Sequence, residues 1–379
     1  MNRPSYLVAI SSSSQLYSGT GRALFDWLAL AAKYFDCSLI IDTFNLDSVH
    51  IAAKECAAID VRLFTSRSNP LPGLIDSGMM DLPSHLRNHQ YDVVECISWA
   101  NGATNLAALE ACSELTKIVF TPHSQPLWTI PDPDRHFLVE PAFRRMLEGS
   151  DLIFVDSPAE AELPAFDGVL RGKIVYAPLG VDASVFSPSE KTSIDNCSVL
   201  TVSDFRERRK RFDALASSFF KAHQQDDQLK LHLVGRGAAE AILGVQCLEG
   251  CKVYAHPRLS RDELVAIYQR SGAFALMSDY EAFGLPIAEA LLCGCPVVLN
   301  DIPVVRSLFS DLPGVFLADN REPEAVAERL FRALAFGTSP DNRAITAQQA
   351  KLRFSLTATQ DIKLSSIFQL LSKDAPPKR

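Results

Sequence analysis

Short apolar runs alternate with longer amphipathic segments along the first half of the chain. Runs of this length bounded by polar residues predict buried strands, and they occupy residues 6–10, 38–41, 61–64, 91–97, 117–120, 152–155 and 174–177. Apolar side chains at helical spacing predict helices between them, most clearly over residues 23–34, 104–112 and 137–147. Strands that alternate with helices are typical of βαβ units, which pair in a parallel sheet.

The same pattern begins again in the second half, after a polar stretch at residues 189–196. A stretch with few apolar side chains is typical of a linker between domains. We predict strands at 198–202, 231–234, 252–255, 273–277 and 315–317, helices at 210–220, 262–269, 287–292 and 323–335, and a helical tail from about 346 to 371. The expected organisation is one α/β domain over residues 1–188, a second over 189–355, and a terminal helix over 356–379.

The segment SDYEAFGLPIAEALLCGCPVV, residues 278–298, follows the predicted strand at 273–277 and contains the predicted helix at 287–292. Glu281 and Glu289 flank its Phe-Gly-Leu-Pro turn. Gly284 has no Cβ and lets the backbone approach a ligand closely, and Pro286 suits the first position of a helix. Free N–H groups at such a helix start form an anion site. The arrangement predicts donors for a diphosphate and two carboxylates for sugar hydroxyls, although a strand-loop-helix unit with two solvated glutamates gives the same pattern.

This segment resembles the donor-site signature of retaining glycosyltransferases of family 4, which have the GT-B fold. The resemblance implies two Rossmann-like α/β domains that face each other across a cleft, with the last helix crossing back onto the first domain. It implies that Glu281 contacts the transferred sugar and that Glu289 holds the ribose of the nucleotide. The backbone at Phe283, Gly284 and Leu285 is expected to meet sugar and phosphate.

Two further sites are expected in the first domain. Gly19 and Gly21 belong to a glycine-rich turn before the predicted helix at 23–34, where the family has a loop close to the donor phosphate and acceptor. A tight strand-to-helix turn explains the two glycines equally well. His123 follows the predicted strand at 117–120 and resembles the family histidine that faces the donor sugar. A histidine that caps a loop is the alternative.

The donor diphosphate requires positive charge. Lys210 stands where the family has its lysine, but Asp204 stands where the family usually has an arginine. Arg206 is two residues on and points to the same side if the backbone stays extended, so it is our candidate replacement. The alternative is a solvated basic turn. Arg258 follows the predicted strand at 252–255 and is expected in the segment that recognises the base.

Composition limits the function classes. The chain has 379 residues, a net charge of −8 and nine cysteines without metal-ligand spacing, so bulk attraction to nucleic acid or anionic lipid is not expected. No Asp-x-Asp metal motif is evident, and we expect neither a metal nor a cofactor beyond the nucleotide-sugar co-substrate. No run reaches the roughly 20 apolar residues of a membrane span. We therefore expect a cytoplasmic location, with at most peripheral contact at the inner membrane face.

The expected activity is transfer of a hexose from a GDP- or UDP-hexose to a hydroxyl, with retention at the anomeric carbon and no metal. The acceptor is expected to be a glycan, a lipid-linked glycan, a polysaccharide or a small molecule. A nucleotide-sugar binding protein without turnover remains an alternative, which Asp204 favours, and a GT-B sugar-nucleotide epimerase is another. The sequence leaves open the base, the sugar, the acceptor, the linkage and the oligomeric state.

Overall fold

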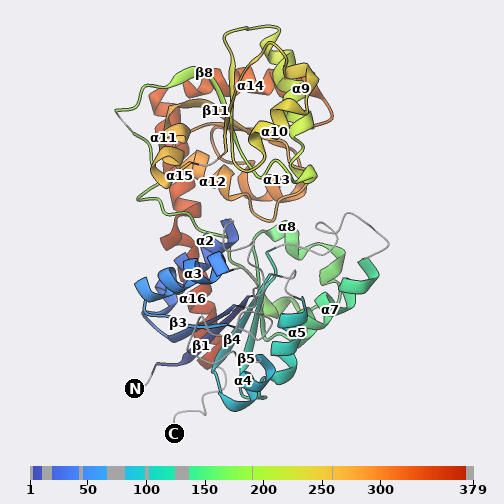
Figure 1. The fold of residues 1–379 in the computed structure, drawn as a ribbon, viewed down its shortest axis with the longest axis vertical. Coiled ribbons are helices and arrows are strands. Elements are labelled where there is room, and N and C mark those ends of the chain that lie inside the picture. The colour runs from blue at the N-terminus through green and yellow to red at the C-terminus, as the bar shows by residue number, and fades with distance from the viewer. Residues whose placement is uncertain are drawn as a thin grey trace. The chain divides into compact units, whose positions relative to one another are not determined.

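The computed structural model describes residues 3–10, 19–41, 46–65, 82–98, 102–123, 136–189, 191–257 and 259–372. The chain divides into two compact units (Figure 1). Unit 1 comprises Met1–Pro178 together with Thr359–Arg379, and unit 2 comprises Leu179–Ala358. The chain thus passes into unit 2 before the predicted position at 188/189, and it returns to unit 1 within the last helix.

Unit 1 is built on a parallel seven-stranded sheet of order β3-β2-β1-β4-β5-β6-β7. The strands are β1 Ser5–Ile10, β2 Asp36–Ile41, β3 Arg62–Thr65, β4 Val93–Ile97, β5 Lys117–Thr121, β6 Leu152–Val155 and β7 Ile174–Tyr176. The helices are α2 Gly19–Ala31, α3 Leu46–Ala58, α4 Leu82–Asn88, α5 Gly102–Ala111, α7 His136–Gly149 and α8 Pro158–Ala161.

Strand β1 explains why both faces of this sheet are covered. Successive side chains of a strand point to opposite faces, and those of Tyr6 and Val8 join one core with α2, α3 and α16 (Leu356–Ser372). Leu7 joins the other core, with α4, α5 and α7. A strand buried on both faces has a nearly continuous apolar sequence, which is the pattern that predicted these strands.

Unit 2 contains a parallel six-stranded sheet of order β10-β9-β8-β11-β12-β13. The strands are β8 Asp195–Val202, β9 Lys230–Val234, β10 Lys252–His256, β11 Ser271–Leu276, β12 Val297–Asn300 and β13 Val315–Ala318. The helices are α9 Phe212–His223, α10 Ala238–Leu243, α11 Arg261–Arg270, α12 Leu285–Leu292, α13 Pro303–Phe309, α14 Pro323–Gly337 and α15 Pro340–Phe354. Ala273, Ala275 and Met277 pack in one core with α9 and α14.

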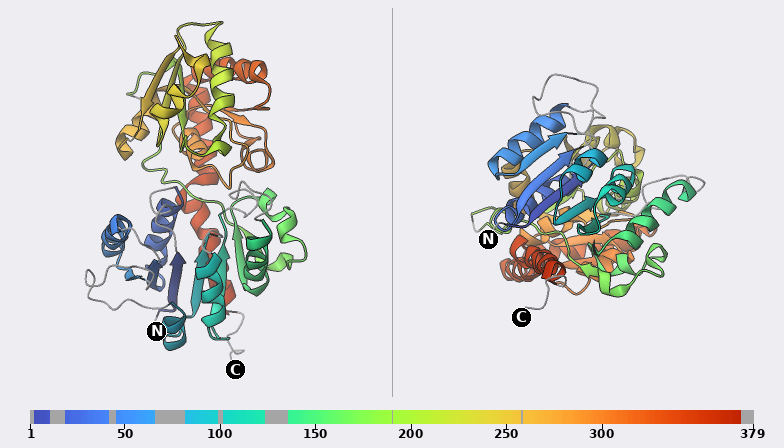
Figure 2. Two further views of the ribbon diagram at one scale, coloured as in Figure 1. Left: turned by 45° about the vertical axis from the view of Figure 1, so that its right-hand side comes forward. Right: turned by 90° about the horizontal axis from the view of Figure 1, so that it is seen from below.

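The C-terminal helix α16 completes the core of unit 1 (Figure 2). Leu364 and Ile367 are buried among side chains of β1 and α2, and the Lys363 ammonium donates to Glu95 Oε1 at 2.5 Å. The predicted helical tail over residues 346–371 is therefore confirmed, and it consists of two helices, α15 and α16, that are separated at Ser355. Ser355 ends α15 with an extended backbone, φ −66° and ψ 149°.

Candidate active site

The order of the strands in unit 2 marks where a ligand site is expected. The chain leaves β8 toward β9 on one side, and β11 pairs with the other side of β8. Ligands of open α/β sheets bind beyond the carboxyl ends of the strands at such a switch point. The loop that follows β8 carries Lys210, and the loop that follows β11 carries Glu281.

Lys210 and Glu281 form an ion pair at this switch point. The Lys210 ammonium lies 2.7 Å from Glu281 Oε1, and the two side chains are 13% and 7% exposed. Burial alone would raise the pKa of the Glu281 carboxyl, but the charges of Lys210 and Arg209 and the hydrogen bond from Lys210 hold that pKa below its ordinary value. Glu281 is therefore an ionised carboxylate, which only accepts hydrogen bonds. Sequence reasoning selected both residues but not their pairing.

Three further contacts join the two loops. Asp279 N donates to the Arg209 carbonyl at 2.8 Å, and the Arg209 guanidinium donates to the Tyr280 carbonyl at 3.1 Å. Arg211 donates to both carboxylate oxygens of Asp279, at 3.2 and 3.3 Å. The basic turn and the loop that carries Glu281 are thus bonded through backbone as well as side chains.

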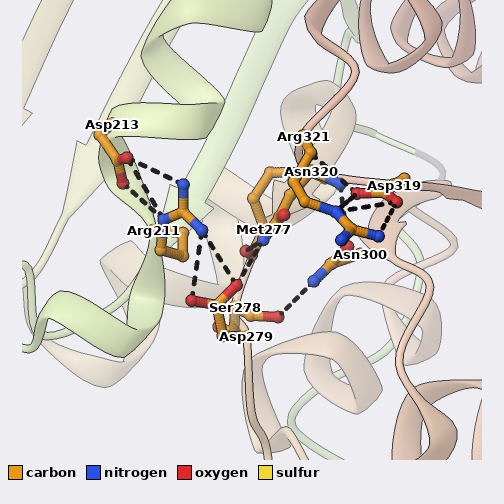
Figure 3. A network of polar contacts seen from close by, with 9 residues as sticks. All are labelled: Arg211, Asp213, Met277, Ser278, Asp279, Asn300, Asp319, Asn320 and Arg321. Atoms are coloured by element: carbon orange, nitrogen blue, oxygen red, sulfur yellow. Dashed lines mark hydrogen bonds and ion pairs between the residues drawn. The ribbon is translucent and has the colours of Figure 1, made fainter.

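Two buried asparagines support the same loop from the ends of β12 and β13 (Figure 3). Asn320 donates from its amide to the Met277 carbonyl and to Asp279 Oδ1, both at 2.8 Å. Asn300 donates to the Ser278 carbonyl at 3.0 Å and accepts from Asn320 N at 3.0 Å. The Met277 and Ser278 carbonyls and the Asp279 carboxylate are therefore held by hydrogen bonds. These bonds fix the position of the backbone that leads to Glu281.

Gly284 precedes α12 with φ +93°, a conformation that side-chain-bearing residues rarely adopt. A Cβ here would lie 2.7 Å from the Ile287 side chain. We predicted Pro286 at the first position of the helix. Helix α12 begins at Leu285, so Pro286 is its second residue. The Phe283 ring packs against Phe309 and Phe354 in the core, so only its backbone is available to a ligand.

Glu289 lies in the second turn of α12. It is the fifth residue of the helix and is 6% exposed. The Tyr268 hydroxyl of α11 donates to Glu289 Oε2 at 3.0 Å. Burial, together with the Glu289 charge, raises the pKa of Tyr268. Tyr268 therefore stays a hydrogen-bond donor that orients the carboxylate.

Arg206 would point to the same side as the usual arginine only with an extended backbone from Asp204 to Arg206, and the backbone here forms a turn. Arg206 N donates to Asp204 Oδ1 at 3.2 Å, which closes a turn, and the Arg206 guanidinium makes two bonds of 2.9 Å to the same carboxylate. Arg236, after β9, lies 2.7 Å from Asp204 Oδ2. Hydrogen bonds from Arg206 lower the pKa of Asp204 against its partial burial. One carboxylate thus holds two guanidiniums that are 60% and 51% exposed.

Unit 1 contains three more of the predicted residues, His123, Gly19 and Gly21. His123 follows β5 with φ +54°, and its Nδ1 lies 3.0 Å from Asp156 Oδ2. Gly19 and Gly21 lie inside the first turn of α2, so the helix begins earlier than predicted and the two glycines are not in a turn that precedes it. Arg258 lies outside the described residues.

Two protein-family models match different parts of this chain. The family model "Glycosyl transferases group 1" matches residues 189–352, and the model "Glycosyltransferase Family 4" matches residues 27–185. Together they cover most of the chain. The chain belongs to glycosyltransferase family 4.

Curated relatives of this family 4 glycosyltransferase include two bacterial enzymes named D-inositol 3-phosphate glycosyltransferase. The one from Xylanimonas cellulosilytica is 26% identical over 76% of this chain and 74% of that protein. The one from Paenarthrobacter aurescens is 25% identical over 64% of each chain, slightly less than two thirds. The O-antigen chain mannosyltransferase B of Escherichia coli is 32% identical over only 19% of this chain.

Solved structures assign the family 4 chain to the GT-B fold. Anabaena HepE in complex with UDP and glucose superposes with a TM-score of 0.74 at 16% identity, covering 96% of this chain and 99% of HepE. The sucrose-phosphate synthase of Thermosynechococcus elongatus superposes with a TM-score of 0.76 at 17% identity, covering 98% and 100%. The predicted fold class is therefore confirmed.

Within the described part of this glycosyltransferase, no group of three or more histidine, cysteine, aspartate or glutamate side chains could hold a metal ion. Its nine cysteines are free thiols. In the same described residues, no helix is both long and apolar enough to cross a membrane.

Sequence reasoning missed Arg209, Arg236 and Tyr268 in this glycosyltransferase. Arg209 is adjacent to Lys210 in a basic run, and only its bond to the Tyr280 carbonyl distinguishes it from its neighbours. Arg236 stands between two glycines after β9, and that Gly-Arg-Gly turn was a usable signal. Tyr268 gave no signal, because an aromatic residue at helical spacing is typical of any core.

Proposed function

We propose that this chain transfers a hexose from a nucleotide diphosphate sugar to a hydroxyl, with retention at the anomeric carbon. The observation that carries the proposal is the buried ion pair of Lys210 and Glu281 at the switch point of unit 2. The names of the curated relatives support a glycosyltransferase. HepE structures that contain UDP or UDP-glucose support a nucleotide-sugar donor.

Glu281 and Lys210 have complementary roles in this proposal. A buried ionised carboxylate accepts hydrogen bonds from sugar hydroxyls, and each such bond involves a charge, which makes it stronger than a neutral one. The Lys210 ammonium has three donors, so it can keep its bond to Glu281 and also donate to a diphosphate oxygen. The pair would therefore bind sugar and phosphate with the geometry already set.

Arg206 and Arg236 supply the second positive charge in the proposal. A guanidinium has five N–H donors in a planar fork that matches phosphate oxygens. Arg206 uses two of its nitrogens on Asp204, so donors remain for a ligand. Asp204 then replaces the usual arginine indirectly, because it holds two arginines at the ends of β8 and β9.

The start of α12 would complete the donor site. Gly284 permits close approach of the backbone, and the first N–H groups of a helix favour an anion. Glu289 would hold the ribose, with its carboxylate oriented by Tyr268. The backbone of Phe283 and Leu285, the glycines Gly19 and Gly21, and Arg258 stay predicted contacts of the donor.

The proposed chemistry uses no enzyme nucleophile and no metal. Departure of the nucleotide builds negative charge on the diphosphate, and cations fixed in place stabilise that charge, which is often the largest single catalytic term. The acceptor hydroxyl would attack the face that the leaving group vacates, and the phosphate oxygen would take its proton. His123 and Glu281 would orient the sugar ring.

The acceptor is proposed as a glycan, a lipid-linked glycan, a polysaccharide or a small molecule. We also propose a cytoplasmic location, with at most peripheral contact at the inner membrane face. An acceptor screen that includes polyprenyl-phosphate sugars, free monosaccharides and inositol phosphates would distinguish between these classes of acceptor.

The test begins with a thermal-shift panel of UDP-, GDP- and ADP-sugars, because a ligand that binds only the folded state raises Tm by mass action. The donor that raises Tm is then used in transfer assays with wild type, Glu281→Gln and Lys210→Met. Both variants should lose transfer at least 100-fold. Glu324→Gln is the matched control, because Glu324, on α14, pairs with Lys221 of α9 and its side chain is 72% exposed.

The assay also distinguishes the alternatives. Binding without transfer or donor hydrolysis would favour a nucleotide-sugar binding protein. A change of configuration in the donor sugar, read by NMR, would indicate an epimerase. Turnover that is unchanged in Glu281→Gln would contradict the proposed site, and inversion at the anomeric carbon would contradict the retaining mechanism.

A further inference from the structure

Three neighbouring strands of unit 1 end in polar residues that are largely buried. Strands β4, β5 and β6 are adjacent in the sheet, and they are followed by Ser98, by His123 two residues after β5, and by Asp156. Ser98 N donates to the Thr121 carbonyl at 2.8 Å, so the chain ends of β4 and β5 remain paired beyond the ladder. Polar side chains from three separate strands therefore lie near one another at the carboxyl ends of these strands.

The backbone at these strand ends adopts an uncommon conformation twice. Ser98 has φ +63° and His123 has φ +54°, and non-glycine residues seldom adopt this left-handed region. Such conformations persist only where the surrounding structure imposes them, and they gather at functional sites. Two of them on adjacent strands place His123 in a backbone geometry that the fold enforces.

The imidazole of His123 faces a buried carboxylate. Its Nδ1 lies 3.0 Å from Asp156 Oδ2 and 3.3 Å from Oδ1, and the two side chains are 11% and 2% exposed. A carboxylate accepts hydrogen bonds, so the Nδ1 atom must carry a proton. In a neutral ring the lone pair then resides on Nε2.

Asp156 is itself held by the start of α8. Its N–H donates to Glu160 Oε2 at 2.8 Å, and Ser157 Oγ accepts from Glu160 N at 3.1 Å. Burial and the nearby Asp156 charge raise the pKa of Glu160 well above its ordinary value. A neutral Glu160 leaves the negative charge on the carboxyl group that contacts the imidazole.

We infer that Asp156 is a positioning residue, which holds His123 in the tautomer protonated at Nδ1 and leaves Nε2 to accept a hydrogen bond from a carbohydrate hydroxyl. The identity of the ligand rests on the proposed function, but the tautomer does not. The same arrangement orients ligating and catalytic histidines in other enzymes, where loss of the supporting carboxylate typically costs 10- to 100-fold.

The tautomer can be measured without a substrate. Two-dimensional ¹H–¹⁵N NMR of ¹⁵N-histidine-labelled full-length protein separates the two tautomers, and comparison with His123→Gln assigns the His123 signals among eight histidines. Wild type should show a protonated Nδ1 that persists as the pH is raised and the ring becomes neutral. A His123 ring protonated at Nε2 in wild type would overturn the inference by itself.

The Asp156→Asn variant tests the inference through enzyme activity. The asparagine keeps the volume but can donate its N–H₂ to Nδ1, which moves the ring proton to Nε2. We expect kcat to fall about 10- to 100-fold, whereas Asp167→Asn, an exposed aspartate of unit 1, should match wild type. An unchanged tautomer in Asp156→Asn would also contradict the inference.

A double variant separates positioning from a purely structural role. If Asp156 acts through the ring, Asp156→Asn should cost nothing further in a His123→Gln background, because residues that act as a unit are non-additive. Additive losses would overturn the inference. If no sugar is transferred at all, the proposed function fails, and the NMR result still decides the tautomer.

Discussion

At the scale of single residues, the charged side chains of the proposed donor site are paired with one another. Glu281 sits with Lys210, and Asp204 sits with Arg206 and Arg236. Buried or partly buried charges need such partners, since burying an unpaired charge is costly. The same pairing that stabilises the empty protein sets the positions of the groups that a nucleotide sugar would use.

The Glu281 carboxylate should make stability depend on pH. Its pKa in the folded protein is below the ordinary 4.5, so its contribution is complete above about pH 4.5 and is lost as the pH falls through the folded-state pKa. Urea unfolding of wild type and Glu281→Gln should therefore differ by about 1–3 kcal/mol at pH 7. The difference should shrink as the pH falls below about 4.5 and through the lower folded-state pKa, and a constant difference would argue against the ion pair.

At the scale of elements, the decisive feature is the short connection between β8 and α9. Residues Arg208–Lys210 form a 3₁₀ turn, Arg211 takes a left-handed conformation with φ +47°, and α9 then begins. The helix predicted to begin at residue 210 therefore begins at Phe212, after this turn. The turn brings Arg209 and Lys210 to the loop after β11, and Arg211 pairs with Asp213 and Asp279.

Two substitutions at Arg211 isolate the cost of its backbone conformation. Arg211→Gly and Arg211→Ala both remove the two ion pairs, but only glycine tolerates φ +47° without strain. Arg211→Gly should therefore be more stable than Arg211→Ala by about 1 kcal/mol, measured by urea unfolding. Equal stabilities would mean that this residue is not left-handed in solution.

Both Arg211 variants should bind the donor more weakly than wild type, because Asp279 loses one of the contacts that hold the loop of Glu281. Asp213→Asn offers a matched comparison, since it removes one partner of Arg211 and keeps the bond to Asp279. Donor affinity in that variant should stay close to wild type.

At the scale of the whole molecule, the chain passes between the two units twice. The last helix leaves unit 2 and finishes the core of unit 1. Glu95, which is fully buried in β4, accepts from Lys363, from Thr121 at 2.6 Å and from Trp27 at 3.1 Å. Burial would raise the pKa of Glu95, but the Lys363 charge and the hydrogen bonds from Lys363, Thr121 and Tyr6 lower it.

The pair of Glu95 and Lys363 should be strongly coupled. Lys363→Met leaves a buried carboxylate without its cation and should destabilise the protein by about 3–5 kcal/mol. Glu95→Gln combined with Lys363→Met should recover a large part of this loss, because no unpaired charge remains. A double-mutant cycle from thermal or urea unfolding measures the coupling, and additive effects would contradict it.

The sequence by itself determined every strand except β12, the parallel α/β class and the identity of Lys210, Glu281 and Glu289 as site candidates. These follow from short-range information, namely apolar runs that must be buried and a motif whose members lie close together along the chain. It could not give the pairing of Lys210 with Glu281, because those residues are 71 positions apart.

Only the tertiary structure decided how the charges are shared. A 3₁₀ turn followed by the left-handed residue Arg211 places Lys210 outside the helix, and a closed turn joins Arg206 to Asp204. The partners Tyr268, Arg236 and Asp156 come from other strands or helices, so no local pattern marks them. Side-chain electrostatics acts through space, and the spatial neighbours of a charge are set by the packing of distant segments.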